Sequence, residues 1–140
     1  MTAVTSTDAV TRCVEGLLRF LETSGVEFPD GLFHDDVFFD FTSPTWRLQA
    51  RGVDGIMHIR QEGHPWPGRV PRSRVDRTTT GFVLEVEETW EADGDTWYCR
   101  ELMRADVAGD AIAEISVYCT GDWDSARVAE HAAAVALIRP

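Results

Sequence analysis

The residues best suited to chemistry lie on the second strand of a β-hairpin that the sequence predicts between Phe82 and Arg104. Side chains alternate between the two faces of a strand, so Trp97, Cys99, Glu101 and Met103 share one face. The other members of this row suit burial, and Glu101 therefore occupies a position where a charge is costly. A buried carboxyl group either has a hydrogen-bonded structural role or takes part in proton transfer.

The partner of Glu101 depends on the turn at residues 93–94, an Asp-Gly pair. A turn with a glycine bulge places Glu85 opposite Glu101, with Glu87 on the same cavity face. A plain two-residue turn moves the register by one residue and brings Glu88 to Glu101 instead. We favour the bulged register, in which Glu85 and Glu87 are the neighbours of Glu101.

Two such glutamates would supply general acid and base groups. Carboxylates about 5 to 6 Å apart on an apolar wall cannot both ionise cheaply, so one keeps its proton near neutral pH. This arrangement suits proton transfer next to a carbonyl, dehydration or epoxide opening, and none of these reactions needs a metal or cofactor. A structural interpretation stays open, in which the glutamates of the first strand form a solvated face and Glu101 pairs with Arg100, Arg104 or Arg60.

Composition narrows the function further. The chain has 140 residues and a formal net charge of -11, so its acidic surface repels the phosphate backbone of nucleic acids. All 13 basic residues are arginine, which excludes a Schiff-base lysine and a phosphate-loop lysine. The four histidines lack metal-pair spacing and the three cysteines are far apart, so no metal site or disulfide framework is expected. No signal sequence or membrane-spanning run is recognisable, and we expect a cytoplasmic protein.

The elements that position these residues follow from hydrophobic periodicity. Apolar side chains at helical spacing predict a first helix from about Thr7 to Thr23, capped by Thr7, with residues 1–6 flexible. Helices first and a curved antiparallel sheet afterwards define an α+β domain, in which the sheet wraps around a helix and leaves a cavity. The other predicted elements are a helical turn near Asp30–Phe33, a helix from Gly52 to about Gly63, strands at Val37–Thr42, Trp46–Ala50, Arg72–Thr80, Phe82–Glu91, Thr96–Ala105 and Ala111–Thr120, and a helix at Asp124–Ile138.

Three segments, in this order and spacing, carry a resemblance to a known superfamily: Leu32–Asp40, Gly52–Ile56 and Ile112–Tyr118. Together they resemble the nuclear transport factor 2-like superfamily, in its polyketide cyclase-like and ketosteroid isomerase-like form, over nearly the whole chain. The resemblance implies one domain over residues 1–140, a cone-shaped α+β barrel. N-terminal helices would pack on a strongly curved antiparallel or mixed sheet that encloses a cavity, and a C-terminal helix would follow. Members include isomerases, epoxide hydrolases, dehydratases, cyclases and non-catalytic proteins, so the fold does not fix the function.

The catalytic residues of these relatives are mostly replaced in this chain. The base of ketosteroid isomerase corresponds to Phe41, with Asp40 turned to the other face, where it is an alternative acid or base. The oxyanion-hole tyrosine corresponds to Phe20, and only the protonated oxyanion-hole acid has a counterpart of the same kind, at Glu101. The acid–base triad of limonene epoxide hydrolase is not preserved either. Steroid isomerisation is therefore not expected.

The resemblance also implies which residues meet the ligand. Arg60 would face the cavity, where its guanidinium either binds a substrate carboxylate or neutralises Glu101. His64, in a proline-rich loop, would contact the ligand at the rim, and Tyr118 would offer a hydroxyl from the last strand. The expected substrate-binding residues are Arg60, Phe20, Phe39, Phe41, Trp97, Cys99, Met103 and His64.

Two hypotheses follow. The first is a cofactor-independent enzyme of secondary metabolism that acts on a hydrophobic small molecule, as an isomerase, dehydratase, hydrolase or cyclase. Its catalytic residues would be Glu101, Glu87, Glu85 and Tyr118, with Glu88 and Asp40 as alternative acid or base groups. The second is a non-catalytic module of the same fold that binds a small molecule or forms a dimer. An apolar outer face on the last strand predicts a homodimer, through Ala113, Ile115, Val117 and Cys119.

Overall fold

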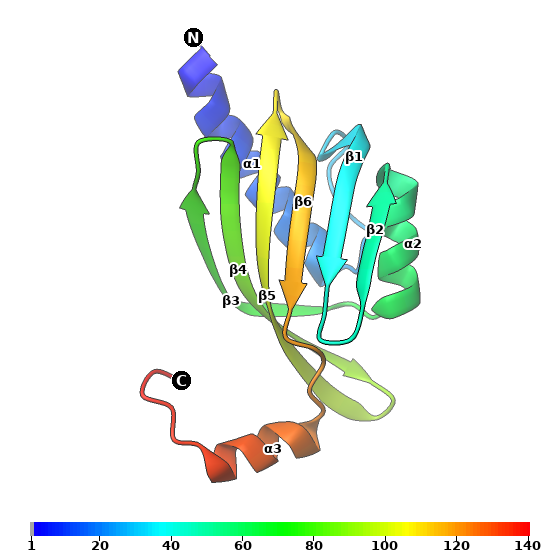
Figure 1. The fold of residues 1–140 in the computed structure, drawn as a ribbon, viewed down its shortest axis with the longest axis vertical. Helices are drawn as coiled ribbons and strands as arrows, with labels where there is room; N and C mark the ends of the chain where they lie inside the picture. The colour runs from blue at the N-terminus through cyan, green and yellow to red at the C-terminus, as the bar shows by residue number, and fades with distance from the viewer. Residues whose placement is uncertain (1) are drawn as a thin grey trace.

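The computed structural model describes the backbone of residues 2–140 and the side chains of residues 9–140. The first helix, α1, spans Thr2–Glu22 and so begins before the expected cap Thr7, whose side chain lies outside the described ones. None of the described helices has the length and apolarity needed to cross a membrane. The remaining elements are β1 (Phe33–Thr42), β2 (Arg47–Arg51), α2 (Val53–Gly63), β3 (Gly68–Arg77), β4 (Gly81–Ala92), β5 (Asp95–Ala108), β6 (Ala111–Cys119) and α3 (Ser125–Ala134) (Figure 1).

The six strands form one mixed sheet in the order β2-β1-β6-β5-β4-β3. Strands β1 and β6 are parallel, and every other neighbouring pair is antiparallel. This confirms the predicted α+β class with N-terminal helices on a mixed sheet. The sheet is not closed into a barrel, because β2 and β3 remain as its two edges (Figure 1).

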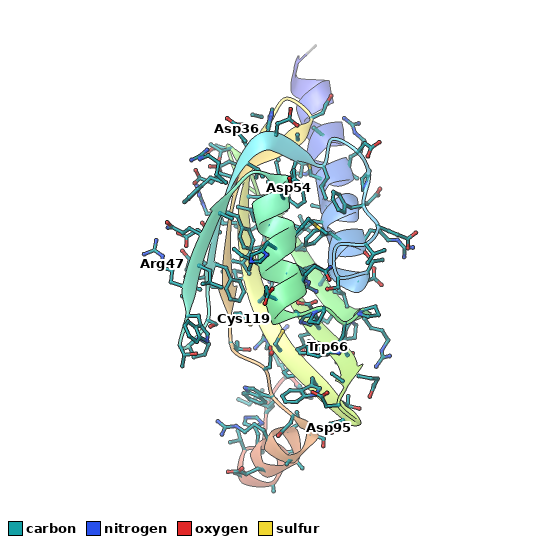
Figure 2. All side chains as sticks on the ribbon, turned by 90° about the vertical axis from the view of Figure 1, so that its right-hand side faces the viewer. Asp36, Arg47, Asp54, Trp66, Asp95 and Cys119 are labelled. Atoms are coloured by element: carbon teal, nitrogen blue, oxygen red, sulfur yellow. The ribbon has the colours of Figure 1, made fainter. Side chains whose placement is uncertain are left out.

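Helices α1 and α2 cover the same face of the sheet, with α2 beside the β1–β2 edge (Figure 2). The core lies between this face and α1, where Leu17 and Phe20 pack with Leu84, Met103 and Ile115, all at most 5% exposed. Burying a large apolar side chain contributes about 1.5 to 3 kcal/mol, so this layer fixes how the sheet curves around the helices. Helix α3 stands apart below the sheet and contacts β5 (Figure 1).

The last strand faces the opposite way from the prediction. Ile115, Val117 and Cys119 point toward the helices, whereas Tyr118 is on the outer face and 56% exposed. A register shift between Asp106 and Val107 places Ile112 inward as well, and the apolar row is buried against α1. The expected apolar dimer face on this strand is therefore wrong, and so is the cavity position of Tyr118.

Two further segments, one before β1 and one at the end of the last helix, also differ from the sequence prediction. No helical turn forms at Asp30–Phe33, because Gly31 takes a positive φ of 81° and β1 begins at Phe33. The last helix ends at Ala134, and the residue after it is extended. Beyond that point Ile138 is 97% exposed, so no packing supports further helix.

Candidate active site

The β4–β5 hairpin has a plain two-residue turn. Asp93 and Gly94 both take positive φ angles, 55° and 74°, which is the type I′ geometry that matches the twist of a hairpin. Glu88 consequently pairs with Cys99, and Val86 pairs with Glu101. The bulged register favoured from the sequence is wrong, and the alternative with Glu88 beside Glu101 is the observed one.

Glu85 and Glu87 lie on the outer face of the sheet, away from Glu101. Glu85 contacts Arg100 at 3.3 Å, and both side chains are about half exposed, at 46% and 56%. Glu87 accepts a hydrogen bond from the Tyr98 hydroxyl at 2.6 Å and pairs with Arg72 at 3.3 Å. These contacts place both glutamates in a solvated face, so their expected position on the cavity face is corrected.

Between the sheet and α2 lies a pocket with a volume of about 870 Å³. Figure 2 shows Cys119 on the inner side of the sheet near α2, whereas Arg47 points away from the molecule. Arg47 binds both oxygens of Asp40, at 2.8 and 3.1 Å, so the carboxyl of Asp40 is held on the outer face as the sequence placed it. The walls are mainly apolar and aromatic, from α1, β1, β2, α2, β5 and β6: Leu17, Phe20, Leu21, Phe33, Phe39, Phe41, Trp46, Leu48, Ile56, Ile59, Met103, Ile115 and Val117.

The pocket receives all of the predicted substrate-binding residues except Trp97. The Trp97 indole donates a hydrogen bond to the Ala92 carbonyl at 3.0 Å and packs with Trp90 in a separate cluster. Of the inward side chains on β5, those of Cys99, Glu101 and Met103 line the pocket, whereas Trp97, nearer the hairpin turn, lies outside it. The predicted residues that line the pocket are Phe20, Phe39, Phe41, Arg60, His64, Cys99, Glu101 and Met103.

Glu101 is a carboxyl group in this mainly apolar wall. It is 7% exposed, and its Oε1 atom is buried without a hydrogen-bond partner among the described residues. A buried polar atom without a partner costs about 1 to 3 kcal/mol, so its retention needs a reason such as a ligand contact. Glu101 is among the residues that line the pocket, so its carboxyl group lies next to the space that a ligand would fill.

Behind Glu101 lies a buried ion pair. Arg60 contacts Glu88 Oε1 at 3.2 Å, and the two side chains are only 11% and 5% exposed. The Arg60 guanidinium also donates to the Ser24 hydroxyl at 3.2 Å and to the Leu21 carbonyl at 3.0 Å. Arg60 therefore neutralises Glu88 rather than Glu101, and its bonds tie α2 to the turn after α1.

The pKa values of Glu88 and Glu101 are shifted in opposite directions. Burial raises the pKa of Glu101 well above its ordinary value, and the charge of Glu88 and a hydrogen bond with it add to this rise. Burial also opposes ionisation of Glu88, but the hydrogen bond with Glu101 and the Arg60 charge outweigh it and lower the pKa of Glu88. Of the two carboxyl groups, Glu101 therefore keeps its proton to the higher pH.

His64 faces the same pocket as a neutral ring. Burial and the nearby Arg60 charge lower its pKa to about 4. Its ring lies 4.2 Å from that of Trp90, and its carbonyl accepts a hydrogen bond from the Ser24 hydroxyl. At neutral pH this imidazole can accept or donate a hydrogen bond, but it does not offer a cation to the ligand.

The pocket residues that the sequence prediction missed include the titratable side chains of His58, Glu62, Cys119 and Asp122. His58 lies off the apolar stripe of its helix, and Asp122 lies in a loop, so neither has a periodicity signal. Cys119 was assigned to the outer face together with Ile115 and Val117, and its place in the pocket follows from the corrected orientation of β6.

Cys99, Glu101 and Cys119 offer ligand atoms that lie within 4.8 Å of one another, and such groups can bind zinc. Other contacts already use both thiols, since Cys99 Sγ donates to Glu88 Oε2 at 3.9 Å and Cys119 Sγ accepts from the Gly121 N–H at 3.4 Å. We therefore interpret the cluster as part of the hydrogen-bond network of the wall, and the expected absence of a metal site stays a prediction.

Comparison with solved structures identifies the fold. A nuclear transport factor 2-like (NTF2-like) protein from Anabaena variabilis matches with a TM-score of 0.68 at 19% identity, over 84% of this chain and 91% of its own. The chain has the nuclear transport factor 2-like fold. This confirms the resemblance seen in the sequence. No protein-family model matches the chain, and a search of curated proteins found no match.

Other solved structures with this fold are described as enzymes. An LEH-like epoxide hydrolase from M. tuberculosis matches at 16% identity with a TM-score of 0.62, over 81% of this chain and 84% of its own. A protein from Xanthomonas campestris described as a polyketide cyclase matches at 14% identity with a TM-score of 0.64, over 79% and 90%. At these identities the likeness establishes the NTF2-like fold, and function has to be argued from the pocket.

Proposed function

We propose that this protein is a cofactor-independent enzyme that acts on a hydrophobic small molecule, with Glu101 as its general acid. The observation that carries the proposal is the buried Glu101 carboxyl, with one oxygen unpartnered among the described residues, in the wall of an apolar pocket. A protonated carboxyl in such a site donates a hydrogen bond to a substrate oxygen without the cost of ionisation.

The chemistry starts at an oxygen of the substrate. Glu101 donates its proton, or a strong hydrogen bond, to a carbonyl, epoxide or hydroxyl oxygen as negative charge develops there. The resulting Glu101 anion lies beside the Glu88 anion, so it regains a proton readily and can accept one from the substrate. This sequence supports isomerisation, dehydration or epoxide opening, and the relatives described as a cyclase and an epoxide hydrolase are consistent with such reactions.

A turnover assay tests the proposal. Hydrophobic ketones, β-hydroxy ketones and epoxides would be incubated with the protein in D₂O and followed by NMR for deuterium exchange, dehydration and hydration. We expect Glu101→Gln to lower the rate by about 10² to 10⁴-fold, the usual contribution of a general acid. Glu85→Gln is the matched control on the outer face and should keep the parent rate. Equal rates in the Glu101→Gln variant and the parent would contradict the acid role.

A second candidate is a binding module without chemistry. The supporting observation is that Phe20, Phe39 and Phe41 line the pocket, with the centroids of the stacked Phe39 and Phe41 rings 6.4 Å apart. Phe20 and Phe41 stand where the resemblance to ketosteroid isomerase implied polar catalytic groups. Such a wall binds planar apolar molecules well. Compounds of the panel that bind tightly and do not react, in the parent as in Glu101→Gln, would favour this function over the enzyme.

A further inference from the structure

We propose that the buried Arg60–Glu88 ion pair is the positioning element of the pocket: it fixes a permanent negative charge behind Glu101 and so keeps the transferable proton on Glu101. This inference rests on the proposed function, because it explains how the acid of that function stays protonated. Glu88 and Arg60 are positioning residues in this account, and Glu101 is the residue that touches the substrate.

The two glutamates have different access to the pocket. Glu101 lines it, whereas Glu88 is 3% exposed and is not among the described residues of the pocket wall. Both belong to the inward row of the hairpin, where Glu88 pairs with Cys99 and Glu101 is two residues farther along β5. Of the two carboxyl groups, Glu101 is therefore the one beside the ligand space, and Glu88 lies behind it.

Arg60 is fixed on the side of Glu88. Its Nη2 atom lies 3.2 Å from Glu88 Oε1 and 3.0 Å from the Leu21 carbonyl, and its Nε atom lies 3.2 Å from the Ser24 hydroxyl. Ser24 is fully buried and in turn donates to the His64 carbonyl. With three partners from two other parts of the chain, the guanidinium is held where it stabilises the Glu88 anion.

The other groups around Glu101 do not offset this asymmetry. Cys99 on β5 and Cys119 on β6 are thiols that face the same space, and His64 after α2 is neutral at ordinary pH. Asp122 at the pocket adds negative charge rather than positive. Arg60 on α2 favours the ionised form of Glu101 only weakly, against burial and the nearby Glu88 charge. Glu101 is therefore the group on which the proton stays.

The ion pair also gives a reason for burying two charges at all. A buried pair contributes little net stability, because desolvation offsets most of the attraction between its members. Replacing Arg60 and Glu88 by apolar residues would cost the fold little, so their presence points to a role in the pocket. That role is to make the proton of Glu101 available at a pH where an ordinary glutamate has lost it.

Infrared titration of the full chain tests this inference. The carbonyl band of a protonated carboxyl, assigned to Glu101 by its loss in Glu101→Gln, would be followed against pH in the parent and in variants. We expect Glu88→Gln to shift the titration midpoint of this band to lower pH. Glu88→Asp keeps the negative charge, so its midpoint should stay close to that of the parent. Glu85→Gln is the outer-face control and should leave the midpoint unchanged.

The outcomes separate this inference from the proposed function. A Glu101 band at neutral pH whose midpoint is the same in Glu88→Gln and in the parent would overturn the role of the ion pair alone. Absence of that band in the parent would overturn the acid role of Glu101 itself. If Glu88→Gln does not fold, the double variant Arg60→Met with Glu88→Gln replaces it, and the same shift to lower pH is expected. The high-pH limb of the kcat/KM profile should move with the band, whereas KM should stay unchanged.

Discussion

A glutamate on each face of the β4–β5 hairpin pairs with an arginine, and the two pairs lie in different surroundings. On the outer face Arg100 lies 3.3 Å from Glu85, and on the inner face Arg60 lies 3.2 Å from Glu88. The distances are nearly equal, but the outer side chains are about half exposed and the inner ones at most 11%. Water and salt screen the outer pair, so its net contribution is about 0 to 1 kcal/mol. Burial, rather than contact distance, distinguishes the two faces, and it is also the main cause of the raised pKa of Glu101 beside Glu88.

The largest expected effect on stability comes from removing the inner arginine, and removal of the outer arginine is its control. Arg60→Met should lower the free energy of unfolding by about 3 to 5 kcal/mol, because it leaves the buried Glu88 charge without a partner. Arg100→Met should change it by about 1 kcal/mol or less. Urea unfolding of the two variants measures the difference. Equal losses would mean that the inner pair is as well solvated as the outer one.

A second test compares how carboxyl groups on the two faces respond to pH. Because the pKa of Glu101 is raised by burial, the unfolded chain loses this proton first as pH rises, and Glu101 lowers stability progressively above the ordinary value of 4.5. Glu101→Gln removes this cost, so the variant should gain stability relative to the parent as pH increases.

The outer control for this test is Asp40. Its pKa is lowered by the hydrogen bond from Arg47, so the carboxyl adds stability above its ordinary value of 3.8 and loses it as pH falls. Asp40→Asn should therefore be less stable than the parent at neutral pH, with the gap closing in acid. Thermal unfolding from about pH 2 to 8 distinguishes the two trends, because the Asp40 gap closes only below 3.8 and the Glu101 effect grows above 4.5. Parallel curves for both variants would contradict the assigned environments.

The smallest expected effect concerns the turn that determines which glutamates face inward. Gly94→Ala should cost roughly 1 to 2 kcal/mol, because its φ of 74° suits glycine although a Cβ there would meet no atom within 4 Å. Gly63→Ala in α2 has equally open surroundings without a positive φ, so it should be neutral or slightly stabilising. Chemical denaturation of both variants checks this, and equal costs would argue against the two-residue turn.

The sequence predicted the fold well because its signals were local. Period-two alternation placed Cys99, Glu101 and Met103 inward, and the order of the elements carried the resemblance that the solved structures confirm. The predicted register of the β4–β5 hairpin was wrong because the Asp-Gly turn sequence allows two ways of pairing the strands. The apolar residues Val86 and Trp90, which flank Glu88 at even spacing, carried the deciding signal, since they require Glu88 to face inward.

Other parts of the site could not be predicted from local patterns. The inward side of β6 was assigned wrongly because an apolar row can face either a helix or a second subunit, and only the packing of α1 decides. The partner of Arg60 depends on how α2 sits against the sheet, which periodicity does not encode. The pairing of Arg60 with Glu88, and the raised pKa of Glu101 beside that pair, therefore required three-dimensional geometry.

The bonds of Arg60 have a consequence for motion. A short helix beside a pocket usually opens locally more often than the central strands do. Here α2 cannot unwind at Arg60 without withdrawing the guanidinium from Glu88 and from the Leu21 carbonyl. The amide hydrogens around Arg60 should thus exchange with solvent no faster than those of β4. Local opening of the pocket should be confined to the β1–β2 hairpin, where Trp46 is 68% exposed.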